Sequence, residues 1–183
     1  MIESVIITSM SDARHMPYRE NLQQDLWITT TDPEDEHRVK KLHARFAKIK
    51  VKHHYQFFRD WSDEDPETYI QDRIEIEGPQ ESHINNIISF LDFYTSDSTA
   101  HHLGVNCFAG ISRSSAIGII ALVMQGKSPE EALEEILRVN PVSWPNLRIL
   151  RLASARLGKN IMSPVLDWKL KERAKGLIIP YEL

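Results

Sequence analysis

The sequence predicts a single α/β domain built on a mainly parallel central sheet with helices on both faces. The chain has 183 residues, of which 42% are hydrophobic, so it can bury one ample core. Short β-type apolar runs alternate with longer segments whose apolar residues recur at helical spacing. Such alternation is typical of parallel sheets, because each parallel connection crosses over through a helix.

Net charge, cysteine count and the length of the apolar runs disfavour several classes of function. The net charge of −4 disfavours binding to nucleic acid or to an anionic membrane surface. The single cysteine excludes an intramolecular disulfide and fits a reducing compartment. No basic leader precedes the first apolar run, and the longest apolar run, residues 116–124, is too short to cross a bilayer. We therefore expect a cytoplasmic protein without a nucleic-acid or membrane partner.

Two strands and one helix are expected before residue 50. The strands are residues 5–7 and 26–30, joined by a loop or short helix. Asp32-Pro33 then breaks the chain, and a helix follows over residues 34–47. The apolar positions of that helix recur three and four residues apart: Val39, Leu42 and Phe46.

An acidic connection separates the third strand from the next helix. Residues 51–57 alternate in polarity, which predicts a strand that ends near Phe58. Residues 59–79 are acidic and lack periodicity, and connections of that length in compact domains are commonly functional. A helix over residues 80–94 then leads to the fourth predicted strand at residues 103–105.

Three further helices are expected toward the C-terminus. Residues 128–131 form a capped start of the first, and the second runs from Pro145 to Gly158. The third is expected at residues 164–175, and an apolar tail follows at residues 177–179. We expect the tail to dock on the surface of its own domain, with partner binding as the alternative.

The junction after the fourth strand carries the strongest functional signal. Cys107, the only cysteine, and Arg113 bracket a five-residue loop directly before an apolar helix over residues 114–124. Loop amides and the free N–H groups of that helix can converge on one point, which favours a thiolate and fits a phosphate. Arg113 supplies a planar fork for two phosphate oxygens.

Small residues complete this loop. Gly110 allows the backbone to turn with positive φ, where a Cβ would clash. The hydroxyls of Ser112 and Ser114 can hydrogen-bond the sulfur or the loop itself. The pattern therefore predicts a thiolate nucleophile facing an oxyanion site.

The loop resembles the Cys-x5-Arg-Ser/Thr signature of cysteine-dependent protein tyrosine phosphatases, and residues 107–116 (CFAGISRSSA) look most like the dual-specificity type. Upstream, residues 56–61 (QFFRDW) resemble the strand end that delivers the general-acid aspartate in such enzymes. Downstream, residues 140–141 (NP) and 144–146 (WPN) look like a bacterial branch of tyrosine-phosphatase-like proteins. The resemblance implies one domain over residues 1–183, with a catalytic core at about 50–160 and a C-terminal helix and tail at about 161–183.

The resemblance implies a phosphomonoester hydrolase that acts through a cysteinyl-phosphate intermediate and needs no metal or organic cofactor. Cys107 is implied as the nucleophile, Asp60 as the general acid, and Ser114 as a donor to the departing thiolate. The phosphate would be held by the loop residues Phe108, Ala109, Gly110, Ile111, Ser112 and Arg113. The loop lacks lysine, which weighs against inositol phosphates as substrates. The expected substrate is a phosphorylated protein or a small phosphomonoester. Phosphotyrosine is the first choice, with phosphoserine and phosphothreonine as alternatives.

Two features depart from the family pattern: the spacing of the acid and the residue before the cysteine. Asp60 and Asp63 both lie farther before Cys107 than the acid of related phosphatases. A rigid strand end favours Asp60, whereas Asp63 would need loop closure to reach the substrate. Asn106 stands where related phosphatases usually have a histidine, and it cannot carry a positive charge. A module that binds phosphate without turnover is therefore the second hypothesis.

Adjacent histidines at residues 53–54 and 101–102 do not predict a metal site. Neighbouring residues of a strand point to opposite faces of the sheet, so the two members of each pair cannot chelate one ion together.

Overall fold

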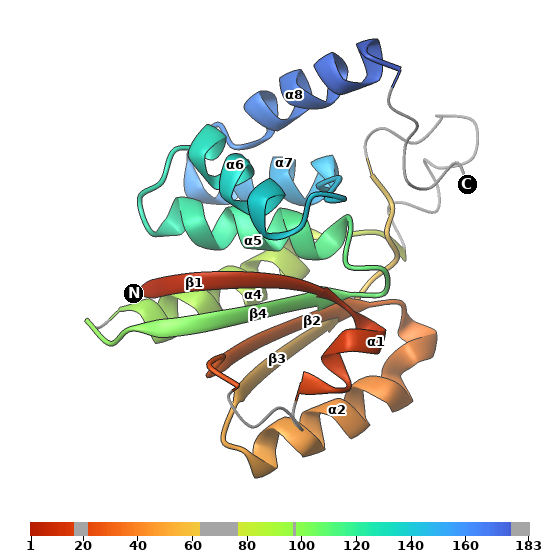
Figure 1. Cartoon of the computed structure of the whole chain (residues 1–183), viewed down its shortest axis with the longest axis vertical. Coiled ribbons are helices and arrows are strands. Elements are labelled where there is room, and N and C mark those ends of the chain that lie inside the picture. Colours follow the sequence, from red (N-terminus) through yellow and green to blue (C-terminus); the bar gives the residue numbers. More distant parts are fainter. Residues whose placement is uncertain (17–21, 63–76, 97, 177–183) are drawn as a thin grey trace.

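The computed structural model describes residues 1–16, 22–62, 77–96 and 98–176. These residues form a four-stranded sheet in the order β1-β4-β2-β3, and every described pairing is parallel (Figure 1). The strands are β1 (Ile2–Ser9), β2 (Leu26–Thr31), β3 (Lys52–Phe57) and β4 (His101–Cys107). The predicted fold class, a single α/β domain with a parallel sheet flanked by helices, is confirmed.

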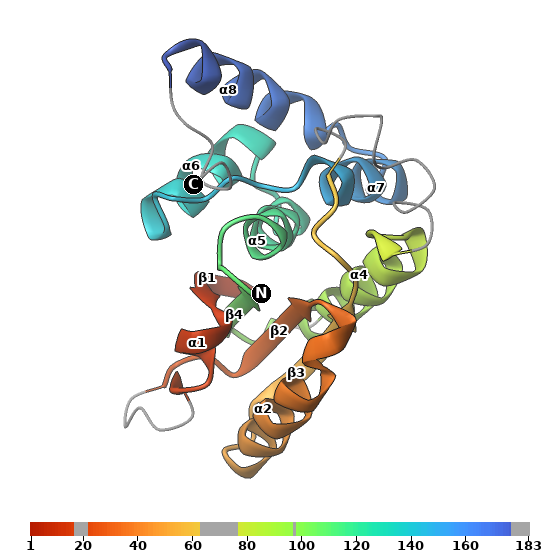
Figure 2. The same cartoon turned by 90° about the vertical axis from the view of Figure 1, so that its right-hand side faces the viewer.

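Helices cover both faces of the sheet (Figures 1 and 2). The short helix α1 (Met10–Ala13) and helix α2 (Glu36–Lys48) lie on one face. Helices α4 (Glu81–Thr95) and α5 (Arg113–Met124) cover the other, with α6 (Pro129–Val139) and α7 (Leu147–Leu157) packed against α5. Helix α8 (Met162–Ala174) lies outermost and contacts α6 and α7.

Some element boundaries differ from the sequence predictions. Strand β1 covers eight residues where three were expected, because it pairs with β4 from Ile2 to Ser9. A 3-10 turn, η2 (Pro33–Asp35), precedes helix α2. The apolar tail at residues 177–179 lies outside the described residues.

Helix α5 occupies the middle of the helical layer. All of its residues from Arg113 to Val123 are buried, as expected for a helix that is apolar all round. It contacts β1, β4, α6 and α7, so its N-terminus is fixed relative to the end of β4. Cys107 is the last residue of β4, and Ser9 at the end of β1 pairs with it. The carboxyl edge of the sheet and the N-terminus of α5 therefore meet at Cys107.

A tryptophan fixes β2 against β4 on the α2 face. Trp27 is fully buried, and its ring lies where a side chain at Gly104 would be, since an added Cβ would come within 2.1 Å of it. The same ring packs on Phe46 of α2 at a centroid distance of 4.8 Å. Only glycine at position 104 leaves room for this ring. In this position the indole N–H of Trp27 reaches the side chain of Asn106.

Within the described residues, no helix combines the length and the apolar character that a membrane span requires.

Candidate active site

Neighbouring elements hold the carbonyl groups of the 107–113 loop outward. Four loop carbonyls accept hydrogen bonds from outside the loop: Phe108 O from Met10 N at 3.0 Å, Gly110 O from Asn140 Nδ2 at 2.7 Å, Ile111 O from Trp144 N at 2.9 Å and Ser112 O from Asn146 N at 3.3 Å. In a trans peptide the N–H points opposite to the C=O, so these bonds turn the following amides toward the loop centre. Inward amides form an oxyanion-binding concavity.

The sulfur of Cys107 lies at the centre of this loop and is buried. It accepts a hydrogen bond from Gly110 N at 3.2 Å and lies 3.2 Å from Ser114 Oγ. Gly110 has φ +79°, and a Cβ there would come within 2.7–2.8 Å of the backbone of Thr8 and Ser9. The glycine is therefore required both by its conformation and by its contact with β1.

Arg113 makes hydrogen bonds through Nη1, while its Nε faces Asp60 at ion-pair distance. Its Nη1 donates to Asp32 Oδ1 at 3.0 Å and to Phe58 O at 2.6 Å, which uses both protons of that nitrogen. Its Nε is buried and has no hydrogen-bond partner among the described residues. The Nε and Nη2 atoms form the edge that can grip two oxygens of one phosphate.

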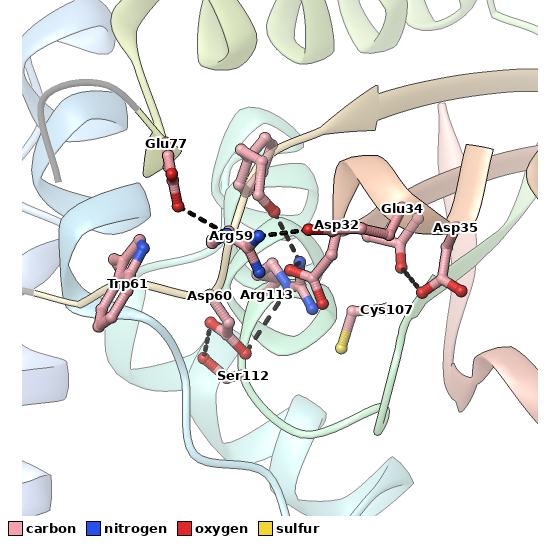
Figure 3. A network of polar contacts seen from close by, with 12 residues as sticks. Asp32, Glu34, Asp35, Arg59, Asp60, Trp61, Glu77, Cys107, Ser112 and Arg113 are labelled. Carbon is pink, nitrogen blue, oxygen red and sulfur yellow. Dashed lines mark hydrogen bonds and ion pairs between the residues drawn. The ribbon is translucent and has the colours of Figure 1, made fainter. Parts of the chain in front are cut away.

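The charge on Arg113 is stabilised by its surroundings although the side chain is only 3% exposed. Burial opposes the charged guanidinium, but the neighbouring Asp60, Cys107 and Asp32 outweigh it and raise the pKa of Arg113. Figure 3 shows these three side chains gathered around Arg113. A cation held in this way is available to an anionic ligand at every physiological pH.

Asp60 lies beside the loop and is held by one oxygen. Its Oδ1 accepts from Ser112 Oγ at 2.7 Å and from Asn146 Nδ2 at 2.9 Å. Its Oδ2 lies 3.6 Å from Arg113 Nε. With Oδ1 occupied by two donors, Oδ2 is the oxygen that faces the guanidinium of Arg113.

Arg59 joins the two ends of the acidic connection between β3 and α4. Its Nε pairs with Glu77 at 2.6 Å, its Nη2 pairs with Glu34, and its backbone N donates to Glu77 O at 2.8 Å (Figure 3). The first and last parts of the connection are therefore joined directly next to Asp60. Asp63, the alternative acid, lies outside the described residues.

Asn106 is fully buried and belongs to a polar network behind the loop. Its Oδ1 accepts from Trp27 Nε1 and from Thr29 Oγ1, both at 2.7 Å. Thr29 Oγ1 also lies 2.8 Å from His53 Nε2. Burial, followed by the charges of His43 and His54, lowers the pKa of His53 to about 3, so this ring is neutral.

The structure brings Cys107, Arg113, Asp60 and Ser114 together. Ser114 contacts the sulfur as expected, whereas the hydroxyl of Ser112 donates to Asp60 and not to the sulfur. The exposed ring of Phe108 stands at the outer side of the loop, 54% accessible. Among the described residues, no group of three or more His, Cys, Asp and Glu side chains is placed to hold a metal ion.

Sequence reasoning missed Asp32 and the role of Asn146. Asp32 directly follows β2, which pairs with β4, so its position at the same sheet edge as Cys107 was the available signal. Asn146 caps α7 through its Oδ1, which accepts from Ile149 N at 3.1 Å, while its Nδ2 holds Asp60. Sequence reasoning began this helix at Pro145 and assigned neither bond to Asn146.

We predict that Asn106→His destabilises the protein. A neutral imidazole has one acceptor nitrogen, so it cannot accept from both Trp27 and Thr29, and one buried donor is left unpaired. The free energy of unfolding, measured by chemical denaturation, should fall by about 1–3 kcal/mol. An unchanged or increased stability would show that the network does not depend on the amide.

No protein-family model matches the sequence, and a search of curated proteins found no match. Among solved structures, the chain is similar to the human tyrosine phosphatase-like serine/threonine/tyrosine-interacting protein, with TM-score 0.58 and 14% identity over 85% of this chain and 91% of that one. Human DUSP28 matches with TM-score 0.53 and 15% identity, covering 82% of this chain and 89% of that one.

The structure of PTPMT1 matches with TM-score 0.53 and 17% identity over 92% of this chain and 95% of that chain. Because all these identities are below one fifth, the likeness concerns the fold and not the activity. The chain therefore has the fold of cysteine-dependent tyrosine and dual-specificity phosphatases.

Proposed function

We propose that this protein is a phosphomonoester hydrolase that acts on phosphotyrosine through a cysteinyl-phosphate intermediate. The observation that carries the proposal is the buried Arg113 Nε, which makes no hydrogen bond among the described residues and only a 3.6 Å ion pair with Asp60, next to a cysteine sulfur inside a loop of inward amides. A buried donor without a partner costs free energy unless a ligand completes it. A tetrahedral oxyanion supplies acceptors for both the guanidinium edge and the amides.

The proposed reaction has two steps. In the first, the Cys107 thiolate attacks phosphorus, the bond from phosphorus to the ester oxygen breaks, and Asp60 Oδ2 gives its proton to the leaving oxygen. Arg113 and the loop amides stabilise the charge on the three remaining oxygens. In the second, Asp60 takes a proton from water, the water oxygen attacks phosphorus, and the sulfur leaves as a thiolate that accepts from Ser114 Oγ.

The charges around the site support a substrate with a single phosphate group. Two carboxylates, Asp32 and Asp60, flank Arg113, and the loop itself holds no lysine. A second phosphate on the same substrate would be repelled by these carboxylates. The exposed ring of Phe108, directly after Cys107, offers an apolar contact for an aryl group, which supports phosphotyrosine. Phosphoserine and phosphothreonine are the smaller alternatives.

A binding module without turnover is the second candidate. It is supported by Asn106, which cannot contribute a positive charge behind the thiolate, and by the similarity to a structure described as a phosphatase-like interacting protein. Such a module would use the same loop and the same Arg113 edge to bind a phosphorylated partner.

Turnover decides between the two candidates. We expect the wild type to hydrolyse p-nitrophenyl phosphate and a phosphotyrosine peptide, and Cys107→Ser to show no rate above background, since the hydroxyl is a far weaker nucleophile at neutral pH. Phosphate release is the measurement, with binding of the same peptide as the control for folding. Tight binding without release by the wild type would support the module and contradict the hydrolase.

We expect Asp60→Asn to slow the reaction in a way that depends on the leaving group. Turnover of phosphotyrosine, a poor leaving group, should fall by about 10²–10⁴-fold, because the leaving oxygen loses its proton donor. An activated aryl phosphate should lose much less, and the basic limb of the pH–rate profile should disappear. The same pattern in Asp63→Asn, with Asp60→Asn nearly normal, would transfer the role to Asp63.

Asp32→Asn should tighten the binding of inorganic phosphate. Asparagine can still accept from Arg113 Nη1, but it removes one negative charge beside the anion, which corresponds to about a threefold to tenfold gain. Calorimetric titration measures the affinity. Asp35→Asn is the matched control, because that carboxylate lies in the same turn but bonds Thr31 and Arg38. Equal gains in both variants would attribute the effect to net charge alone.

A further inference from the structure

The indole of Trp27 fixes the positions of the protons in the network behind the loop. The indole Nε1–H of Trp27 can only donate, so the atom of Asn106 that faces it at 2.7 Å is the amide oxygen. Thr29 Oγ1 faces the same oxygen at 2.7 Å and must donate its only proton there. His53 Nε2, 2.8 Å from that hydroxyl, must then be the donor of the next hydrogen bond.

This assignment leaves the other nitrogen of His53 with a lone pair. In a neutral imidazole with Nε2–H, the Nδ1 atom is an acceptor. It faces Nδ1 of His43 at 3.3 Å, and the two rings have a centroid distance of 5.3 Å, so their Nδ1 edges approach each other. Sequence reasoning did not find this pair, because His43 comes from α2 and His53 from β3.

The distance between the two nitrogens suits a shared metal ion. Nitrogens that bind one tetrahedral zinc at about 2.0–2.1 Å lie roughly 3.3 Å apart. Metal-binding histidines usually donate their second ring N–H to a fixed acceptor, which orients the ring. Thr29 Oγ1 provides that acceptor for His53 and is itself held by Asn106.

The space beside the pair is open. Both histidines line a pocket of about 460 Å³, together with Phe90 and Tyr94, which leaves room for water ligands. Lys50 and Lys52 line the same pocket and oppose any cation held by charge alone. An ion there must be held by its affinity for imidazole, which favours zinc, copper or nickel over magnesium or calcium.

We propose that His43 and His53 form a binding site for a first-row transition metal ion such as Zn²⁺, with water completing its coordination shell. When the ion binds, the proton between the two Nδ1 atoms moves to Nε2 of His43, so both neutral rings offer a lone pair at Nδ1 to the metal. The site lies at the outer end of the Thr29–Asn106 network and does not depend on the proposed hydrolase activity.

The test is calorimetric titration of the full chain with ZnCl₂ in a Cys107→Ser background, which removes the cysteine sulfur as a competing ligand. We expect one saturable zinc site and no binding of MgCl₂. His43→Ala should weaken zinc binding at least about tenfold, and Thr29→Val should weaken it by about 10–100-fold, because the His53 ring loses its orienting acceptor.

His37→Ala is the matched control. This histidine is exposed on the same helix as His43 but has no part in the pocket, so its replacement should leave zinc affinity unchanged. His43 is also exposed, and its truncation leaves the core intact. The proposal is overturned by the absence of saturable zinc binding, or by equal affinity in His43→Ala and its parent.

Discussion

A buried guanidinium sets the arrangement of the whole site. Arg113 begins helix α5 inside the protein, and a buried charge is tolerated only when neighbouring groups pair with it and accept its protons. Those groups come from the ends of two other strands: Asp32 after β2, and Phe58 and Asp60 after β3. The carboxyl edge of the sheet is thereby drawn around one cation, and the sulfur of Cys107 lies within its field.

The shape of the 107–113 loop depends on elements that contribute no side chain to the candidate site. Trp144 donates its backbone N–H to the loop, and its ring lies below Lys169 of α8 at 4.9 Å and beside Trp168 at 5.3 Å. The outermost helix therefore packs against a residue that orients a loop peptide. A rigid second layer of this kind is what keeps donors aimed at a ligand without reorganisation.

The sequence was most informative where the determinants are local. The loop from Cys107 to Arg113, the apolar helix after it and the cap at Ser128 each depend on residues close together in the chain, and each could be predicted. The contacts of Asp32, Asn146 and Thr29 join segments that are far apart, so spacing could not reveal them. The full length of β1 likewise depends on its pairing with β4.

The bonds between Arg59 and Glu77 make the position of Asp60 independent of the length of the acidic connection. Because residues 59 and 77 are joined to each other, chain added or removed between them does not pull on the strand end. Lengthening a closed loop costs little, about 0.6 kcal/mol for each doubling. In this chain, a foreign peptide inserted between residues 59 and 77 should therefore be accommodated while Asp60 stays beside the loop.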